Sequence, residues 1–378
     1  MFNIAPAIFF LLLFLSSYFG CIFLMGPLLW LLAISPKLFR FAMDSLIAAW
    51  LTFASALMEL FLGLKFRHYG DSIDKRDCAI IIMNHPSRLD WMYIWYLLMR
   101  FGCLSTLKII MKHELKNLPG PGWAMQAAHY MFLHRAWDHD QPYITECVDY
   151  FNIVGCKTQI LIFPEGTNFT PQTKAQSDAY AEKEGLAPLK RVLQPRTLGF
   201  VHLRQQLGDR LDAVYDLTQD FIDTNSSPPP SSELKFLRGQ LPAGIAWRVR
   251  RHPASSVPMD AGRAADWLRK LWRDKDLSLC NNIYQSSDLA SGDQSLEPTE
   301  ACSPTFACRI WLIIFLIAWL VFVATSIFWL ATSWLALAAF SGLNAAFAGL
   351  AAKRFGAGLD AVTRRAARRK QRGRNKDE

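Results

Sequence analysis

The sequence predicts an α/β fold: a mixed sheet flanked by helices, with an N-terminal membrane anchor and a C-terminal transmembrane hairpin. Three observations support this prediction. Long uncharged apolar runs lie near both ends of the 378-residue chain, 52% of the residues are hydrophobic, and short apolar segments alternate with helical patterns between those runs. A mean hydropathy of +0.12 is too apolar for an ordinary soluble domain. We therefore expect one globular domain of ordinary size together with membrane segments.

The N-terminal part, residues 1–65, is predicted to attach the chain to a membrane. Residues 4–35 are almost continuously apolar and carry no charge, whereas a membrane span needs roughly 20 such residues. No basic region or cleavage site is evident, so we expect an uncleaved anchor. Lys37 and Arg40 follow the run, and the positive-inside rule then places the next part of the chain in the cytosol. Two acidic residues interrupt residues 41–64, which favours an interfacial helix over a second span.

Residues 66–280 are predicted to form the globular α/β domain, which also contains the candidate sites described below. Apolar, β-branched segments indicate strands, and apolar residues at helical spacing indicate helices. The expected strands are 79–83, 107–111, 130–134, 159–163, 212–217 and 245–251, and the expected helices follow residue 90 and cover 142–154 and 261–275.

The first candidate site follows the strand that ends at Met83. His85 stands just past this strand, and Asp90 lies five residues later at the start of a helix. An Asp90 carboxylate that accepts the Nδ1–H of His85 would leave Nε2 able to take a proton. The chain has no G-x-S-x-G motif, so we expect the substrate to bring its own nucleophile, such as a hydroxyl that attacks an activated acyl group. Alternatively, Ser87 and Asp90 form only a helix-capping box, and His85 is an incidental turn residue.

A second candidate site follows the strand at 159–163. Pro164 ends this strand, and Glu165, Gly166 and Thr167 come next. The plain alternative is a strand followed by a turn. If the two strands are parallel neighbours, Glu165 shares one edge of the sheet with the first candidate site. The backbone N–H groups of Gly166 and Thr167 would then be available to a phosphate or a developing oxyanion.

These two segments also carry a family resemblance. Asn84-His85-x-x-x-x-Asp90 and Phe163-Pro164-Glu165-Gly166-Thr167 resemble the first and third motifs of the glycerolipid acyltransferases related to 1-acylglycerol-3-phosphate acyltransferase. Residues 122–135 resemble the second motif, and residues 192–200 resemble the fourth. The similarity covers about residues 10–280 and is strongest to the lysocardiolipin acyltransferase branch. The chain departs from the family where it has Asn168 in place of an arginine, and from that branch where it has Pro86-Ser87 in place of Arg-Thr; both positions bear on the choice of lipid headgroup.

The resemblance implies an acyl-CoA co-substrate and a lysophospholipid acceptor, with no cofactor and no metal. It also makes Arg135 and Arg196 candidates for binding the acceptor's phosphate, because a guanidinium binds phosphate through two parallel hydrogen bonds. For either arginine the alternative is a solvated or structural side chain. Glu165 would repel a phosphate, so we expect it to orient an arginine or to accept from a substrate hydroxyl.

The C-terminal part contains a linker, a hairpin and a basic tail. Residues 281–308 are polar, and residues 309–352 are apolar over about twice one span, with possible breaks at Thr332-Ser333 and at residues 341–344. The tail, residues 353–378, has ten Lys or Arg and three Asp or Glu, a net charge of 10 − 3 = +7. We expect attraction to anionic lipid on the cytosolic side, and no nucleic acid partner, because the tail follows a membrane segment.

The combined prediction is an integral membrane acyltransferase of the endoplasmic reticulum whose catalytic domain faces the cytosol and which re-acylates a lysophospholipid. Eight scattered cysteines without a C-x-x-C pair agree with a reducing compartment. One alternative is a 1-acylglycerol-3-phosphate acyltransferase that makes phosphatidic acid, or an enzyme for lysophosphatidylglycerol or lysophosphatidylinositol. A second alternative, from another class, is a non-enzymatic membrane scaffold.

Overall fold

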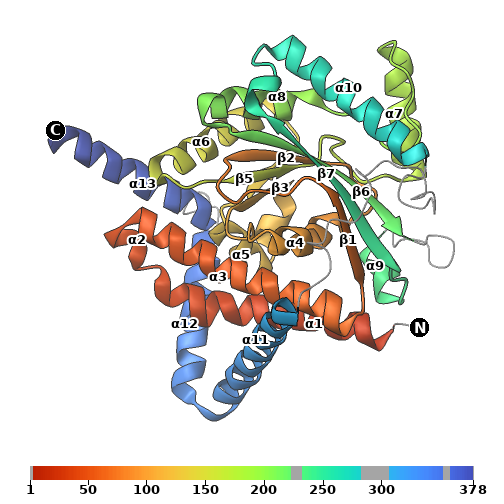
Figure 1. Cartoon of the computed structure of the whole chain (residues 1–378). Helices are drawn as coiled ribbons and strands as arrows, with labels where there is room; N and C mark the ends of the chain where they lie inside the picture. Colours follow the sequence, from red (N-terminus) through yellow and green to blue (C-terminus); the bar gives the residue numbers. More distant parts are fainter. Residues whose placement is uncertain (1–2, 223–231, 282–305, 352–357, 378) are drawn as a thin grey trace. The chain divides into compact units, whose positions relative to one another are not determined.

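The computed structural model describes residues 3–222, 232–281, 306–351 and 358–377 (Figure 1). The chain forms two compact units that are interleaved along the sequence. The first unit comprises Met1–Ala7, Met58–Cys103 and Gln159–Phe306, and the second comprises Ile8–Leu57, Leu104–Thr158 and Ala307–Glu378. Most of the predicted linker at 281–308 lies outside the described residues.

The first unit contains the predicted mixed sheet. Its strands run in the order β1-β7-β6-β2-β5, with β2 parallel to both β5 and β6, β1 parallel to β7, and β6 antiparallel to β7. The strands are β1 (Lys65–Gly70), β2 (Ala79–Met83), β5 (Gln159–Ile162), β6 (Ala213–Ile222) and β7 (Gly244–Pro253). Every residue of β2 is buried, as expected for a central strand covered on both faces. Since β2, β5 and β6 are parallel, their carboxyl ends meet at one edge of the sheet.

Helices complete the first unit. They are α4 (Asp90–Arg100), α7 (Pro171–Lys183), α8 (Thr197–Leu207), α9 (Glu233–Leu237) and α10 (Ala261–Cys280). Helix α10 packs against α8, and it buries Ala264, Leu268 and Trp272 at helical spacing. The predicted strands at 79–83 and 159–163 and the helix after residue 90 are confirmed. The helix predicted at 261–275 continues to Cys280.

The second unit consists mainly of helices, with one short parallel strand pair. The pair is β3 (Leu107–Lys112) and β4 (Met131–Leu133), both near predicted positions. The helices are α1 (Ile4–Phe19), of which residues 4–7 lie in the first unit, α2 (Leu31–Ile34), α3 (Pro36–Ala56), α5 (Pro121–Ala127), α6 (Trp137–Val154), α11 (Phe306–Thr332), α12 (Trp334–Ala351) and α13 (Gly358–Asp377).

Among the described residues, the segments Ile4–Ile34, Pro36–Phe61 and Arg309–Thr332 are long and apolar enough to cross a membrane. The first is interrupted by a π-turn at Gly20–Met25 and a 3-10 turn that contains Pro27. The second segment covers the region for which the sequence favours an interfacial helix. Its length and composition alone do not distinguish an interfacial helix from a membrane span. The predicted break at Thr332-Ser333 is confirmed, since α11 ends at Thr332 and α12 begins at Trp334; the segment Trp334–Gly349 is apolar but shorter than the three candidate spans.

The N-terminus contacts the first unit. The backbone N–H of Asn3 donates to the carbonyl of Leu237 at 2.9 Å, and both residues belong to that unit. A single crossing between residues 7 and 58 would place these two parts of one compact unit on opposite faces of a membrane. The first apolar segment agrees with the expected N-terminal anchor, and from this contact we infer an even number of crossings, or none, between residues 7 and 58.

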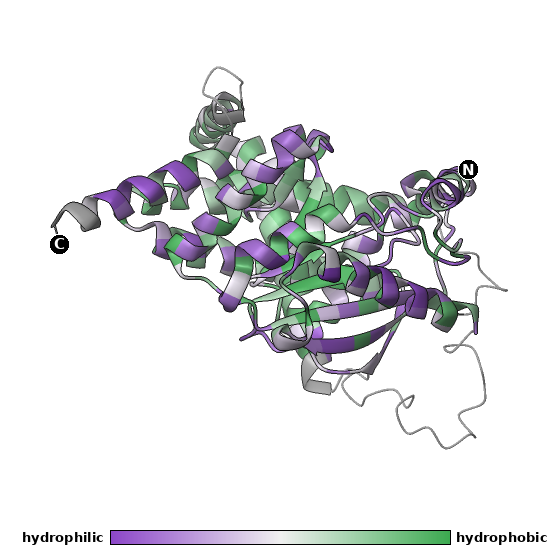
Figure 2. Ribbon diagram, turned by 90° about the horizontal axis from the view of Figure 1, so that it is seen from above, coloured by the Kyte–Doolittle hydropathy of each residue, from purple (hydrophilic) through white to green (hydrophobic). Residues whose placement is uncertain are grey.

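The predicted basic tail is largely an ordered helix. In α13, Asp360 and Arg364 are buried and form an ion pair at 3.1 Å, and further ion pairs join Asp360 to Lys116 and Arg364 to Glu146. Figure 2 shows the hydrophilic character of this helix along much of its length.

Candidate functional site

His85 and Asp90 form a hydrogen-bonded pair at the carboxyl edge of β2. The ring nitrogen Nδ1 of His85 lies 3.0 Å from Oδ2 of Asp90, as their spacing predicts. The His85 side chain is 16% exposed, so a substrate can reach it, whereas the Asp90 side chain is completely buried. The ring of Phe163 stacks on the imidazole at a centroid distance of 4.3 Å. Since a carboxylate accepts, Nδ1 is the protonated nitrogen and Nε2 is left as the basic one.

The carboxylate of Asp90 also binds groups other than His85. Its Oδ2 accepts the backbone N–H of Ser87 at 2.7 Å, and its Oδ1 accepts from the side-chain amide of Gln219 at 2.5 Å. Burial raises the pKa of Asp90, and the hydrogen bonds from His85, Ser87 and Gln219 act in the opposite direction. The capping interaction and the His85 interaction therefore coexist on one carboxylate and do not exclude each other.

Glu165 joins the first candidate site to the second. Its Oε1 accepts the backbone N–H of His85, and its Oε2 accepts that of Leu193, each at 3.2 Å. The residue is 3% exposed, and burial raises the pKa of its carboxyl group to about 8 in spite of these two donors. Glu165 therefore holds two backbone segments together, and its expected role of orienting an arginine or accepting from a substrate hydroxyl stays a prediction.

Arg196 lies against Gly166. Gly166 has a φ of +69°, and a Cβ atom there would lie 3.1 Å from Cδ of Arg196. The backbone N–H of Arg196 donates to the carbonyl of Pro164 at 2.7 Å.

 The N–H of Gly166 donates to the carbonyl of Phe163 at 3.0 Å, which corrects the expectation that this group is available to a substrate. Thr167 follows, half-buried. The structure therefore brings Arg196 to the second candidate site.

Arg135 belongs to the second unit, whereas the other predicted site residues belong to the first. It follows β4, at the predicted strand end, and its side chain is exposed. Its φ of 64° is unusual for a residue other than glycine, which marks a tight turn between β4 and α6.

Two buried polar residues of this site are missing from the sequence prediction. Gln219 binds Asp90, and Asp276 accepts the backbone N–H groups of residues 190–192, which precede Leu193. Gln219 is, like His85, a polar residue near the carboxyl end of a buried strand, but the sequence does not show which other strand end lies beside it. Asp276 lies on α10 and carries no comparable signal in the sequence.

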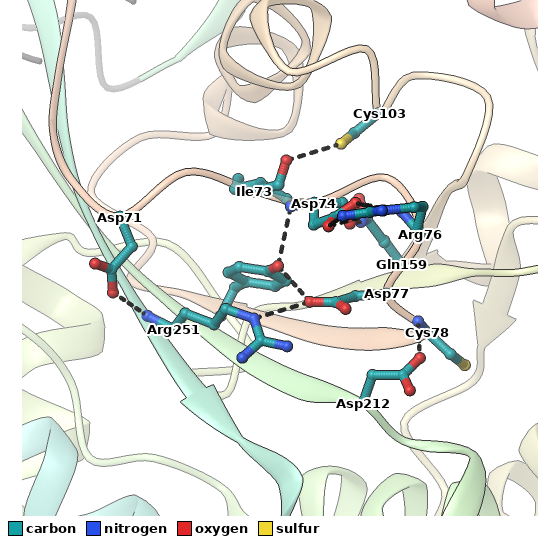
Figure 3. Close-up of polar contacts among 11 residues, drawn as sticks. Asp71, Ile73, Asp74, Arg76, Asp77, Cys78, Cys103, Gln159, Asp212 and Arg251 are labelled. Atoms are coloured by element: carbon teal, nitrogen blue, oxygen red, sulfur yellow. Dashed lines mark hydrogen bonds and ion pairs between the residues drawn. The ribbon is translucent and has the colours of Figure 1, made fainter.

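A second polar network lies at the opposite, amino-terminal edge of β2 (Figure 3). Asp77 accepts from the hydroxyl of Tyr215 at 2.6 Å and from Arg251 at 2.9 Å, and Asp71 accepts the backbone N–H of Arg251 at 2.7 Å. These groups pair with one another and hold the segment between β1 and β2 against the sheet. We therefore assign this network to the fold.

Comparison with known proteins identifies the family of this chain. The family model named Acyltransferase matches residues 65–216. Lysocardiolipin acyltransferase 1 of Danio rerio is 41% identical over 273 residues, which are 72% of this chain and 69% of that protein. The protein of the same name from Mus musculus is 40% identical, with 73% of each chain covered. Lysophosphatidylinositol acyltransferase 10 of Caenorhabditis elegans is 36% identical, covering 66% of this chain and 63% of that protein.

A crystal structure of the 1-acyl-sn-glycerophosphate acyltransferase PlsC from Thermotoga maritima aligns with a TM-score of 0.45 and 17% identity, covering 73% of this chain and 98% of that one. The identity to the lysocardiolipin acyltransferases, over most of both chains, decides the assignment. The chain belongs to the glycerolipid acyltransferase family, in the lysocardiolipin acyltransferase branch, and is an acyltransferase.

Proposed function

We propose that this enzyme transfers a fatty acyl group from acyl-CoA to the free hydroxyl of an anionic lysophospholipid, with His85 as the general base. The observation that carries the proposal is the 3.0 Å contact between His85 and the buried carboxylate of Asp90. This contact presents Nε2 as a proton acceptor in a side chain that remains partly exposed. No further cofactor or metal is needed for direct transfer.

In the proposed reaction, Nε2 of His85 takes the proton of the acceptor hydroxyl as its oxygen attacks the thioester carbonyl. A new C–O bond forms, and the carbonyl electrons move to oxygen in a tetrahedral intermediate. Collapse of this intermediate breaks the C–S bond, and the imidazolium returns the proton to the leaving thiolate. The products are the ester and CoA, and Asp90 stabilises the imidazolium in between.

Arg196 supplies positive charge beside the turn at Gly166, which supports a role in holding the acceptor's phosphate. Arg135 is the second candidate for this role. We propose a lysocardiolipin-like acceptor, because the relatives that are about 40% identical carry that name. Lysophosphatidylinositol and 1-acylglycerol-3-phosphate remain the competing acceptors, since other relatives are named for them.

The proposed location is the endoplasmic reticulum membrane, with the catalytic unit on the cytosolic face. Apolar helices long enough to span a membrane support membrane attachment, and the basic α13 supports the cytosolic side. Membership of an acyltransferase family leaves the alternative of a non-enzymatic scaffold without support.

The experiment is an acyl-CoA transfer assay with purified protein across a panel of lysophospholipids. We expect the highest kcat/KM with a lysocardiolipin acceptor. His85→Ala and Asp90→Asn should each lower kcat by about 10³-fold or more, as loss of a general base does. His139→Ala is the matched control, because His139 also lies beside an aspartate but is 63% exposed and belongs to the second unit. Normal turnover by the His85 variant would refute the proposed mechanism.

A further inference from the structure

Gln219 donates a hydrogen bond to the second oxygen of the Asp90 carboxylate. His85 and Ser87 bind Oδ2, whereas the Nε2 of Gln219 donates to Oδ1 at 2.5 Å. The Gln219 side chain is on β6, next to β2 in the sheet, and the residue is only 1% exposed. At such burial, water does not replace a lost hydrogen bond without rearrangement, so the amide is an essential partner of this oxygen.

Trp247 determines which end of the Gln219 amide faces Asp90. Its indole Nε1–H donates to Oε1 of Gln219 at 3.0 Å. An indole N–H can only donate, so it selects the amide oxygen and turns the amide nitrogen toward the carboxylate. Trp247 is completely buried on β7, and its ring stacks on Phe66 at a centroid distance of 5.8 Å. The orientation of Gln219 is therefore fixed by a rigid neighbour.

The backbone of Gln219 is also fixed relative to His85. The N–H of Gln219 donates to Oδ1 of Asn84 at 2.7 Å, and Nδ2 of Asn84 donates back to the carbonyl of Gln219 at 2.9 Å. Asn84 directly precedes His85 in the chain. These two hydrogen bonds fix the position of Gln219, whose amide donates to one oxygen of Asp90, relative to His85, which binds the other oxygen.

We propose that Gln219 is a positioning residue of the acyl-transfer site: oriented by Trp247, its amide holds the Asp90 carboxylate in the geometry and charge that His85 requires. The inference rests on the function proposed above. Donors on a buried carboxylate favour the ionised form, and Gln219 is one of three on Asp90. Removing it raises the affinity of the coupled His85–Asp90 pair for its first proton.

Other titratable groups also act on Asp90. Glu165, from the end of β5, and Tyr93, from α4 itself, interact with it electrostatically, and His85 faces it from the preceding segment. None of these groups changes in a Gln219 variant, so a displaced pH profile reports the lost amide donor.

The test is the pH profile of kcat/KM for three variants. Gln219→Met should lower kcat about tenfold and move the acid limb upward by roughly one pH unit, the equivalent of tenfold in proton affinity. Trp247→Phe should move the acid limb in the same direction by less, because the Gln219 amide remains but can rotate and exchange the positions of its oxygen and nitrogen. Gln219→Glu should work at low pH, where the new carboxyl group is protonated and can donate, and should lose activity as that group ionises and repels Asp90.

Two control variants separate this role from general destabilisation. Gln205→Met changes an exposed glutamine on α8. Trp272→Phe changes a completely buried tryptophan whose indole nitrogen has no hydrogen-bond partner among the described residues. Both should keep the profile of the unmodified enzyme.

An unshifted acid limb in Gln219→Met and in Trp247→Phe would overturn the inference while leaving the proposed function intact. If Gln219→Met does not fold, Trp247→Phe and Gln219→Glu decide by the same criterion. Failure of the unmodified enzyme to transfer acyl groups, or full activity of His85→Ala, would instead refute the proposed function.

Discussion

At the scale of single residues, burial and hydrogen bonding oppose each other at Glu165. Burial prevails and raises its pKa from 4.5 to about 8. Between these values the folded protein holds a proton that the unfolded chain releases. The contribution of Glu165 to the free energy of unfolding is therefore complete below about pH 4 and is lost as the pH rises to about 8, by up to about 1.4 kcal/mol per pH unit.

Glu165→Gln removes this titration, so its stability should depend less on pH in that window. The measurement is the thermal unfolding midpoint in detergent between pH 5 and 8, with Glu184→Gln, an exposed site on the same unit, as control. Equal slopes for the Glu165 variant and the unmodified protein would contradict the prediction.

Gly166 allows a test of the Arg196 assignment. Alanine at position 166 must adopt a φ of +69°, at a cost of about 1 kcal/mol, and must also push Arg196 aside. Gly185 has a φ of +65° but open space around its Cβ position, so Gly185→Ala carries the backbone cost alone. We expect Gly166→Ala to raise KM for the acceptor about fivefold, and Gly185→Ala to leave it unchanged. Equal KM values in acceptor titrations would remove Arg196 from the binding site.

The His85–Asp90 pair could be predicted because both residues lie within one strand-to-helix turn. Gln219 could not, because it is 129 residues from Asp90 in the sequence. Its position depends on the register between β2 and β6, in which Met83 pairs with Leu217. A sequence indicates that a strand is buried, but it does not indicate which residue of a distant strand lies beside its end.

At the scale of elements, α10 fixes the segment that reaches Glu165. The carboxylate of Asp276, 6% exposed, accepts the N–H groups of Lys190, Arg191 and Val192 at 2.6–3.3 Å. Asp276→Asn keeps one oxygen but places an amide N–H against backbone donors. We expect a loss of about 2 kcal/mol in stability and a higher KM, since the segment also holds Glu165.

Asp274→Asn on the same helix is the control, because Asp274 is exposed. In urea unfolding, Asp276→Asn should be about 2 kcal/mol less stable than Asp274→Asn. In acceptor titrations, Asp276→Asn should show the higher KM. A stable Asp276 variant with an unchanged KM would show that α10 does not shape the site.

The predicted elements are those with a strong apolar pattern, and the errors lie at their ends. Strands β6 and β7 extend to ten residues each because they pair with each other in antiparallel fashion, a long-range contact that the local pattern does not contain. Helix α6 begins at Trp137, five residues before the predicted start, and includes Pro142. Helix α7 was not predicted, since it is polar over most of its length and buries only Ala181.

At the scale of the whole molecule, α13 carries some of its arginines buried in ion pairs and others exposed on its surface. Arg364 is buried in ion pairs, whereas Arg369 and Arg372 are exposed. Attraction to an anionic bilayer is worth about 1 kcal/mol per basic residue near the surface. A fluorophore at Gln371→Cys should be quenched more by brominated phosphatidylglycerol than by brominated phosphatidylcholine, and Arg369→Glu with Arg372→Glu should abolish the difference.

Arg263→Glu with Arg273→Glu makes the same charge change on exposed residues of α10 and should leave the quenching unaltered. Equal quenching by both lipids in the unmodified protein would refute the lipid contact of α13.

The connectivity of the first unit constrains how the chain crosses a membrane. Residues 1–7, 58–103 and 159–306 form one compact unit, and Asn3 is hydrogen-bonded to Leu237 within it. The segments Ile4–Ile34 and Pro36–Phe61 must then both cross or both return to the side where they began. An N-terminal epitope and the exposed thiol of Cys280 should therefore lie on the same side of sealed microsomes.

The measurement pairs protease protection of the epitope with labelling of Cys280 by a membrane-impermeant maleimide. A cysteine at Ser333, between α11 and α12, is the control, because a crossing hairpin places it on the opposite side from Cys280. Accessibility of Cys280 together with protection of the epitope would require an odd number of crossings between residues 7 and 58. That result would be incompatible with the hydrogen bond between Asn3 and Leu237, because an odd number of crossings leaves these two residues on opposite sides of the bilayer.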